Sequence, residues 1–366
     1  GAGTETGTGV IGSAERERDD GAGRREGRAF GVAAHGFGYL GGFNGAGTGR
    51  ACPRPFDAYS FVDLAAAHGL AGVELPEGYL RGMDAGGLAR LRSYGEARRL
   101  YFVLAGGVLE PRGTGALIGS ATALGARTVR VTASTILCGD RRGVASRWPE
   151  YLSEVAERLR SVGERAEEAG VSIAVENHQD LTSEELVRLC ASAGSESVGV
   201  TLDAVNPLAV AEEPLEFARS LGPLIKHVHL KDYRIFSTPQ GYRLVRCPVG
   251  SGVLDVPGLF RVLAREAPDA TVVVELGALE ARHVRFLEED FWRGYPARPF
   301  ERVLPVLRTR EGRSRPPGEE WRTPWELGAD HDALAAYEMG QFEESLAFLR
   351  GIDPTVRDRR GRGSQG

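Results

Sequence analysis

The sequence predicts an α/β protein with a single (β/α)₈ TIM barrel, and three observations support this fold. Short apolar, β-branched runs alternate with longer amphipathic stretches from about residue 29 to residue 308. This alternation is typical of a parallel sheet. Eight such units with nearly continuous apolar strands favour closure into a barrel. An open doubly wound sheet is disfavoured, because the Gly-rich stretch 36–49 lacks the GxGxxG spacing expected after its first strand.

Eight runs are expected to form the barrel strands, because each is short, apolar and rich in β-branched residues. In chain order they are Phe30–His35, Gly72–Leu75, Tyr101–Ala105, Thr128–Thr132, Ser172–Glu176, Gly199–Asp203, Ile225–Leu230 and Thr271–Glu275. Amphipathic stretches between and after them predict helices. The clearest are Asp57–His68, Gly115–Leu124, Trp148–Ala169, Ser183–Ala193, Leu215–Leu221 and Val256–Ala264.

Capping residues mark the ends of several of these helices. Thr182 precedes Ser183 and two acids, which is typical of an N-cap with negative charge in the first turn. Asp255 precedes Val256-Pro257, a second cap with proline in the opening turn. Gly170 stands where the longest helix is expected to end.

The barrel is expected to occupy residues 29–310. Residues 1–28 are rich in Gly, Arg and acidic residues, which predicts a disordered tail. They lack the apolar segment of a signal peptide, which argues against a secretory signal. Residues 311–366 predict a linker, one amphipathic helix at Asp332–Leu349 and a disordered end. We expect this C-terminal helical extension to pack on the barrel or on a neighbouring subunit, and a homo-oligomer is compatible with the sequence.

Composition excludes several classes of protein. The 366 residues are 42% hydrophobic and 26% charged with a net charge of −5, so no excess of basic charge indicates binding to nucleic acid or an anionic membrane. No run approaches 18 apolar residues, which argues against a membrane span. The four cysteines are far apart, which predicts reduced thiols in a cytoplasmic protein.

Four late strands each end in a potential metal ligand: Glu176, Asp203, His229 and Glu275. The carboxyl ends of barrel strands meet at one rim, and the period of two places these side chains on the inward face. A single glutamate at a strand end is more often a cap or an ion-pair partner. Three carboxylates at one rim require a positive centre, however, because like charges would otherwise force protonation. Three carboxylates and one imidazole suit Mn²⁺, Mg²⁺ or Co²⁺ better than structural zinc.

Motifs around these residues resemble those of the xylose isomerase-like barrel superfamily. They are Val-Glu-Asn-His (175–178), Thr-Leu-Asp-Ala-Val-Asn-Pro (201–207), His-Val-His-Leu-Lys-Asp (227–232), Gly-Ser-Gly (250–252) and Val-Val-Glu-Leu (273–276). The likeness is to the sugar (phosphate) isomerase/epimerase branch and covers about residues 29–308. It implies that Glu176, Asp203, His229 and Glu275 hold one divalent ion, with Mn²⁺ as the expected metal.

The resemblance also implies a mechanism. A metal bridging adjacent hydroxyl and carbonyl oxygens of a keto-sugar stabilises the enediolate formed when a carbon acid loses its proton. In similar epimerases two glutamates remove and return this proton, roles that fall here on Glu176 and Glu275. The sequence therefore predicts a metal-dependent isomerase or epimerase of a small-molecule keto-sugar or related polyol derivative.

Other polar residues are expected near the substrate. His178 and Lys231 share the inward phase of Glu176 and His229, so they are candidates for substrate contact. Arg234 follows three residues after Lys231, in the loop expected there, where it would bind an anion or be an ordinary surface arginine.

Two residues on the early strands are further candidates to line the substrate site. Glu74 and His35 end the second and first strands and are expected at the same rim. His227 lies one layer deeper than His229 and is expected to be a core residue.

The pattern departs from the branch at one position, since epimerases commonly carry His three residues after the strand-six Asp and this chain has Asn206. The change also removes a ligand of the three-zinc endonuclease branch, which together with the acidic charge argues against a repair nuclease.

A lyase on the same scaffold is the main alternative, by decarboxylation of a 3-oxo sugar acid or cleavage of a 3-keto-glycoside. Lys231, His178 and an extended loop from Phe236 to Gly252 could serve such a substrate. A non-catalytic binding module is disfavoured by the intact ligand set.

Overall fold

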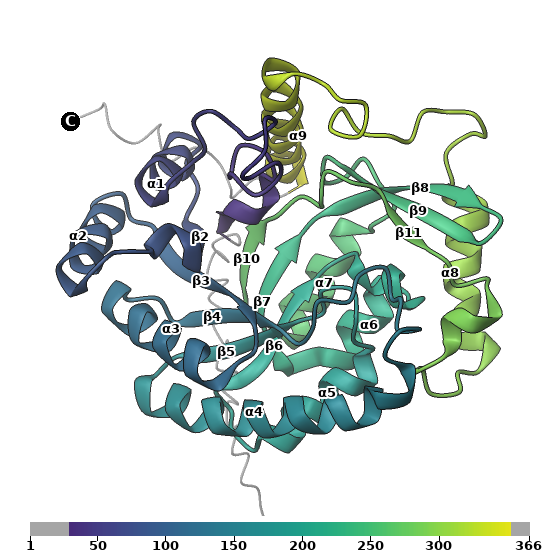
Figure 1. Ribbon diagram of the computed structural model, residues 1–366, viewed down its shortest axis with the longest axis horizontal. Helices are drawn as coiled ribbons and strands as arrows, with labels where there is room; N and C mark the ends of the chain where they lie inside the picture. Colours follow the sequence, from purple (N-terminus) through teal and green to yellow (C-terminus); the bar gives the residue numbers. More distant parts are fainter. Residues whose placement is uncertain (1–28, 353–366) are drawn as a thin grey trace, which may run out of the picture.

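A computed structural model of the chain describes residues 29–352 and shows a closed barrel of eight parallel strands (Figure 1). Their order around the barrel is β1-β10-β7-β6-β5-β4-β3-β2. The strands are Phe30–Ala33 (β1), Gly72–Pro76 (β2), Tyr101–Val108 (β3), Thr128–Thr132 (β4), Ser172–Glu176 (β5), Val198–Asp203 (β6), Ile225–Leu230 (β7) and Thr271–Val274 (β10). The tail predicted for 1–28 and the end predicted after 352 lie outside the described residues.

Helices cover the outside of the barrel. They are Ala58–Ala67 (α1), Ala85–Glu96 (α2), Pro111–Leu124 (α3), Trp148–Ala169 (α4), Ser183–Ala193 (α5), Pro214–Leu221 (α6), Val256–Glu266 (α7), Phe300–Arg313 (α8) and His331–Ile352 (α9). The expected bounds of α4 and α5 match the structure, whereas α2 and α8 were not among the clearest helical patterns. Three glycines in α2 and the internal Pro305 of α8 weaken their helical patterns, which explains why the sequence did not delimit them.

The caps expected from the sequence are present. Thr182 accepts a hydrogen bond from the backbone N–H of Glu185, and the Glu185 carboxylate accepts one from the backbone N–H of Thr182. Asp255 accepts the N–H of Gly258 at the start of α7. Gly170 ends α4 in the left-handed region with φ of 66°, a conformation that glycine adopts without a Cβ clash.

The segment expected to be an extended loop from Phe236 to Gly252 is instead part of a three-stranded antiparallel sheet, so that expectation was wrong. Its strands, in the order β11-β9-β8, are Asp232–Thr238 (β8), Gly241–Cys247 (β9) and Arg282–Val284 (β11). One face buries a cluster of apolar side chains that includes Tyr233, Ile235, Tyr242, Leu244 and Val284. Most residues of β8 and β9 are buried, but the arginines Arg234, Arg243 and Arg246 weaken the apolar pattern that predicts a strand.

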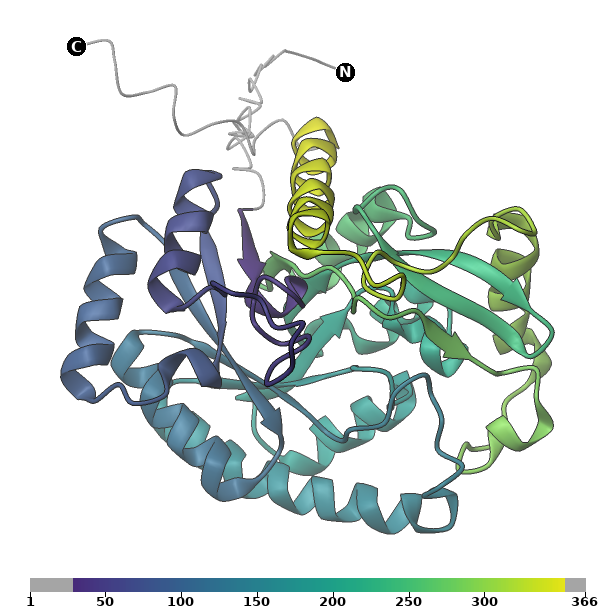
Figure 2. The same cartoon turned by 45° about the horizontal axis from the view of Figure 1, so that its top comes forward.

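Helix α9 packs on the barrel, which is one of the two alternatives expected for it. The Phe342 ring lies 5.2 Å from the ring of Phe37, and both belong to the main core. The buried Glu338 carboxylate accepts the backbone N–H of Tyr39 at 3.1 Å and of Leu40 at 2.8 Å. Figure 2 shows α9 beside the loop that follows β1, so the last described helix fixes the first loop of the barrel.

Within residues 29–352, none of the helices combines the length and the apolar character that crossing a bilayer requires.

We expect Glu338→Ala to lower the free energy of unfolding by roughly 3–5 kcal/mol, because it leaves a buried cation without its partner. Glu338 lies 3.5 Å from the Nη1 atom of Arg246, whose side chain is buried. Chemical denaturation followed by circular dichroism measures the change. The exposed Glu344 on the same helix provides the control, and Glu344→Ala should change stability by less than about 0.5 kcal/mol. Equal stabilities of the two variants would contradict the role of Glu338.

Candidate active site

The four predicted ligands converge at the carboxyl ends of four neighbouring strands, β5, β6, β7 and β10. The register pairs Asp203 with His229 and His229 with Val273, two positions before Glu275. Because side chains alternate along each strand, this register turns Glu176, Asp203, His229 and Glu275 into the barrel. One ligand atom from each lies within 4.8 Å of those of the others, and all four side chains are buried.

Each of the four residues keeps one buried atom without a hydrogen-bond partner in the described part of the chain. These atoms are Glu176 Oε2, Asp203 Oδ1, His229 Nδ1 and Glu275 Oε2. Leaving a buried polar atom unsatisfied costs free energy, so native proteins rarely do so without a ligand or an ion. Their remaining contacts are ion pairs, between Glu176 Oε2 and Arg130 and between His229 Nδ1 and Glu275 Oε2, and a cation with oxygen and nitrogen ligands fits among the four atoms.

The balance of charge around this cluster also fits a divalent ion. Arg130 Nε lies 3.1 Å from Glu176 Oε2 and 3.7 Å from Glu74 Oε1. Lys231 Nζ lies 2.7 Å from Asp203 Oδ2 and 3.9 Å from Glu275 Oε1. These two permanent cations offset two of the four buried carboxylates. Two negative charges then remain, which a divalent cation would neutralise.

Protons compensate for these charges when no cation is bound. Burial raises the pKa of Asp203 well above its usual value, although Lys231 opposes the shift. Burial alone would lower the pKa of His229, but the carboxylates of Glu275 and Glu74 raise it well above the ordinary value. Burial would raise the pKa of Glu275, but His229 and Lys231 together lower it to about 2. Asp203 and His229 therefore hold the protons that a metal ion would displace.

Asp203 is held in one orientation by its neighbours. Its Oδ2 atom accepts hydrogen bonds from Asn206 Nδ2 at 2.5 Å and pairs with Lys231, which leaves Oδ1 for the shared centre. The Asn206 side-chain oxygen in turn accepts the Tyr233 hydroxyl at 3.0 Å. Asn177 exchanges side-chain hydrogen bonds with the Asp203 backbone, at 2.6 Å and 3.0 Å. Asn206 thus acts here through Asp203.

His178 and His35 lie near the cluster and are half-buried. The Nδ1 atom of His178 is buried without a hydrogen-bond partner among the described residues, and burial lowers the pKa of this imidazole. His35 stacks on Phe43 with ring centroids 4.6 Å apart, and its Nδ1 lies 3.2 Å from Arg130 Nη2. Burial, reinforced by Arg130, lowers the pKa of His35 to about 4, so its ring is neutral at pH 7. Both rings therefore present uncharged nitrogen atoms.

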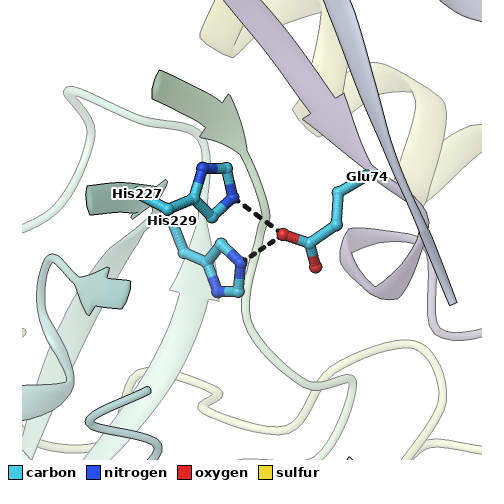
Figure 3. A group of neighbouring side chains, drawn as sticks. All are labelled: Glu74, His227 and His229. Carbon is cyan, nitrogen blue, oxygen red and sulfur yellow. Dashed lines mark hydrogen bonds and ion pairs between the residues drawn. The ribbon is translucent and has the colours of Figure 1, made fainter. Parts of the chain in front are cut away.

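Two other predicted substrate-binding residues occupy different environments. Arg234 is on β8, on the opposite face of that strand from Tyr233, and no hydrogen bond or ion pair within residues 29–352 joins it to the four ligands. Glu74 is completely buried, and its Oε2 atom lies 2.8 Å from the Nε2 atoms of both His227 and His229 (Figure 3). Glu74 thus lies directly behind the candidate metal ligand His229.

Arg130 was not among the sequence candidates, although a signal was present. It is the only charged residue of strand β4 and has the inward phase of Thr128 and Thr132. A charged side chain in the centre of a buried strand requires a buried partner. Arg130 also donates a hydrogen bond to the carbonyl of Gly106 at 3.0 Å, which fixes its position across the barrel interior.

A parallel eight-stranded barrel with three carboxylates and an imidazole at its carboxyl-terminal rim defines a class of (β/α)₈ proteins with a candidate site for a divalent metal. Residues 62–289, more than half of the chain, match the family described as xylose isomerase-like TIM barrel. The chain belongs to this family.

Two curated relatives align with part of the chain. The uncharacterised protein YihM of Escherichia coli K12 is 30% identical over 146 residues, which cover 38% of this chain and 45% of YihM. An inosose dehydratase of Bacillus thuringiensis is 29% identical over 140 residues, which cover 34% of this chain and 47% of the dehydratase. The matches therefore span less than half the length of either relative.

Two solved structures share the fold over most of their length. D-psicose 3-epimerase from Clostridium cellulolyticum H10, solved with D-tagatose, has a TM-score of 0.54 and 15% identity and covers 90% of this chain and 100% of its own. The IOLI protein, solved with a bound zinc atom, has a TM-score of 0.50 and 16% identity and covers 77% of this chain and 98% of its own. At these identities the likeness shows the barrel architecture.

We expect Mn²⁺ binding to the metal-free protein at pH 7 to release protons from Asp203 and His229, since both groups have raised pKa values. The apparent affinity should therefore fall as the pH is lowered. Calorimetric titration in two buffers with different heats of ionisation measures the number of protons released. An affinity that stays constant between about pH 5.5 and 8 would contradict this assignment of the protons.

Proposed function

We propose that this protein is a divalent-metal-dependent isomerase or epimerase of a keto-sugar or a related polyol derivative. The observation that carries the proposal is the placement of Glu176 and Glu275 on strands separated by two others, each with a buried oxygen that faces the shared centre. Paired carboxylates at such a centre suit the removal and return of a carbon-bound proton. The family and the fold shared with a sugar epimerase support this choice.

Glu176, Asp203, His229 and Glu275 would hold the cation, for which we propose Mn²⁺. Oxygen ligands predominate in the set, which suits Mn²⁺ or Mg²⁺, although the IOLI protein was solved with a bound zinc atom. When bound, the ion would supply Lewis-acid polarisation of the substrate's carbonyl and hydroxyl oxygens.

The two glutamates are ionised although they are buried. Burial would raise the pKa of Glu176, but Arg130 and His229 lower it well below the usual value, and the pKa of Glu275 is lowered to about 2. Either carboxylate is therefore able to accept a proton from the carbon beside the carbonyl. In an isomerase the same carboxylate returns the proton to the neighbouring carbon, whereas in an epimerase the other glutamate delivers one to the opposite face.

We further propose that His178 and Lys231 contact the substrate. The unpartnered Nδ1 of His178 offers a hydrogen bond to a hydroxyl group. The buried ammonium of Lys231, between Asp203 and Glu275, offers a positive charge to an oxygen that becomes negative during the reaction. The four cysteines are free thiols, which fits the cytoplasmic location that we propose for this enzyme.

A lyase is a second candidate, favoured by the similarity to an inosose dehydratase over part of the chain. Removal of a proton beside a carbonyl also allows loss of a leaving group from the next carbon. The first step would be the same proton abstraction by a glutamate, with Lys231 beside the developing negative charge.

Candidate keto-sugars incubated with the Mn²⁺-loaded protein in D₂O distinguish these functions. An isomerase or epimerase should introduce deuterium at the carbon next to the carbonyl and yield products of otherwise unchanged composition. A lyase should instead release water, CO₂ or an aglycone. Mass spectrometry and proton NMR separate these outcomes. Absence of both exchange and release across keto-sugars and their acid and phosphate derivatives would contradict the proposed function.

We expect Glu176→Gln and Glu275→Gln each to lower kcat by about 10²–10⁴-fold at saturating Mn²⁺, because the amide retains an oxygen but cannot accept the proton. Glu280→Gln is the matched control, since Glu280 lies five residues after Glu275 and bonds to Asn44 outside the cluster. Its kcat should change less than about twofold. Full turnover by either ligand variant would contradict its role as the base.

A further inference from the structure

We propose that Glu74 is a positioning residue whose carboxylate fixes the tautomer of His229, so that the Nδ1 atom of this imidazole, and not Nε2, faces the metal site. The inference rests on the metal site of the proposed function and adds a role for the buried layer beneath that site. Glu74 is on β2 and His229 is on β7, so the contact crosses the barrel interior (Figure 3).

The contact is close and excluded from water. Glu74 Oε2 lies 2.8 Å from His229 Nε2 and 2.8 Å from His227 Nε2, and all three side chains have no exposed surface. The two imidazole rings are nearly perpendicular, with an interplanar angle of 87°, and they approach the same oxygen from neighbouring layers of one strand. Two short contacts to one carboxylate oxygen require two donors, because an ionised carboxylate only accepts hydrogen bonds.

Both imidazoles must therefore carry a proton on Nε2. In the neutral ring the other nitrogen is then an acceptor. For His227 this nitrogen lies 2.7 Å from the Thr271 hydroxyl, which donates to it. For His229 it is the Nδ1 atom, which lies in the shared cluster in contact with Glu275 Oε2. Glu74 thereby leaves the lone pair of His229 directed at the place where a cation would bind.

Arg130 completes the arrangement by lying beside the other oxygen of Glu74. The second oxygen of Glu74, Oε1, lies 3.7 Å from Arg130 Nε and lacks a hydrogen-bond partner within residues 29–352. The guanidinium is anchored by the Gly106 carbonyl at 3.0 Å and reaches Glu176 at 3.1 Å. One cation thus contacts both the carboxylate behind His229 and the carboxylate of a ligand, which joins the two layers.

A second metal ion among Glu74, His227 and His229 is a weaker interpretation of the same cluster. These three residues also provide ligand atoms within 4.8 Å of one another. Their Nε2 atoms, however, are already paired with the carboxylate at hydrogen-bond distance. A carboxylate that orients a metal-bound imidazole is a recurrent arrangement, and loss of such a partner weakens metal binding by about 10–100-fold.

The test compares Mn²⁺ affinity in two variants that break different halves of the same contact. Glu74→Gln removes the negative acceptor from His229, and we expect the Mn²⁺ dissociation constant to rise by about 10–100-fold. His227→Gln replaces the other imidazole by an amide but leaves Glu74 paired with His229, so the dissociation constant should change less than about threefold. Calorimetry with Mn²⁺ alone gives both values, and circular dichroism shows that each variant is folded.

Equal weakening in both variants would overturn the proposal, because it would indicate a general disturbance of the barrel interior. Unchanged affinity in Glu74→Gln would overturn it as well, while leaving the metal site and the proposed reaction intact. Wild-type protein that binds no Mn²⁺ would remove the metal site itself and with it the role of Glu74.

A second measurement observes the imidazole protons directly in the wild-type protein. In Mg²⁺-loaded wild-type protein with ¹⁵N-labelled histidine rings, we expect His227 and His229 both to show a slowly exchanging proton on Nε2, because both are buried donors to Glu74. Their resonances are assigned by comparison with His227→Gln. A proton on Nδ1 of His229 would overturn the proposal.

Discussion

The site depends on a single electrostatic constraint, the burial of four carboxylates inside one barrel. Each would carry a large desolvation penalty alone, and together they repel one another. Arg130 and Lys231 each contact two of these carboxylates, so every acid has a cationic neighbour. The arrangement still lacks two positive charges, and this deficit is located where the ligand atoms of Glu176, Asp203, His229 and Glu275 meet. Affinity for a divalent cation would follow from the charge left uncompensated by the fold.

The barrel provides the rigidity that this arrangement needs. Parallel strands fix the register, and the register fixes which side chains share a layer: Asp203 is level with His229, and Thr201 with His227. The outward side chains of the same strands, such as Val200, Leu202 and Val228, are fully buried against the helices. A shift of one residue in any strand would exchange these two faces and expose the charged residues to apolar helices. Packing of the outer layer therefore preserves the geometry of the inner one.

The sequence was most informative where periodicity and chemistry agreed. Inward phase and position at strand ends identified Glu176, Asp203, His229 and Glu275, and the structure brings their side chains together. Arg130 was not predicted because it lies in the middle of its strand, whereas the predicted site residues were chosen from the carboxyl ends of strands.

Contacts between distant strands could not be derived from periodicity alone. The link between Glu74 and the two histidines spans more than 150 residues and depends on barrel closure. In the antiparallel sheet, only the outer strand β11 comes from a distant segment, beyond Glu275, whereas β8 and β9 are a local hairpin whose arginines weakened the strand pattern. The capping sequences at Thr182 and Asp255, by contrast, are local and were recognised directly.

The junction between Glu338 and the loop after β1 has a consequence for the order in which the chain matures. The loop leaves the ribosome early, but the acceptor for two of its backbone N–H groups follows 298 and 299 residues later. Until α9 has been synthesised and has docked, the wall of the barrel mouth that carries His35 and Phe43 lacks this anchor. In a nascent or C-terminally shortened chain, the loop after β1 would therefore be exposed and unanchored although the barrel strands are present. Chaperones and proteases recognise such exposed segments.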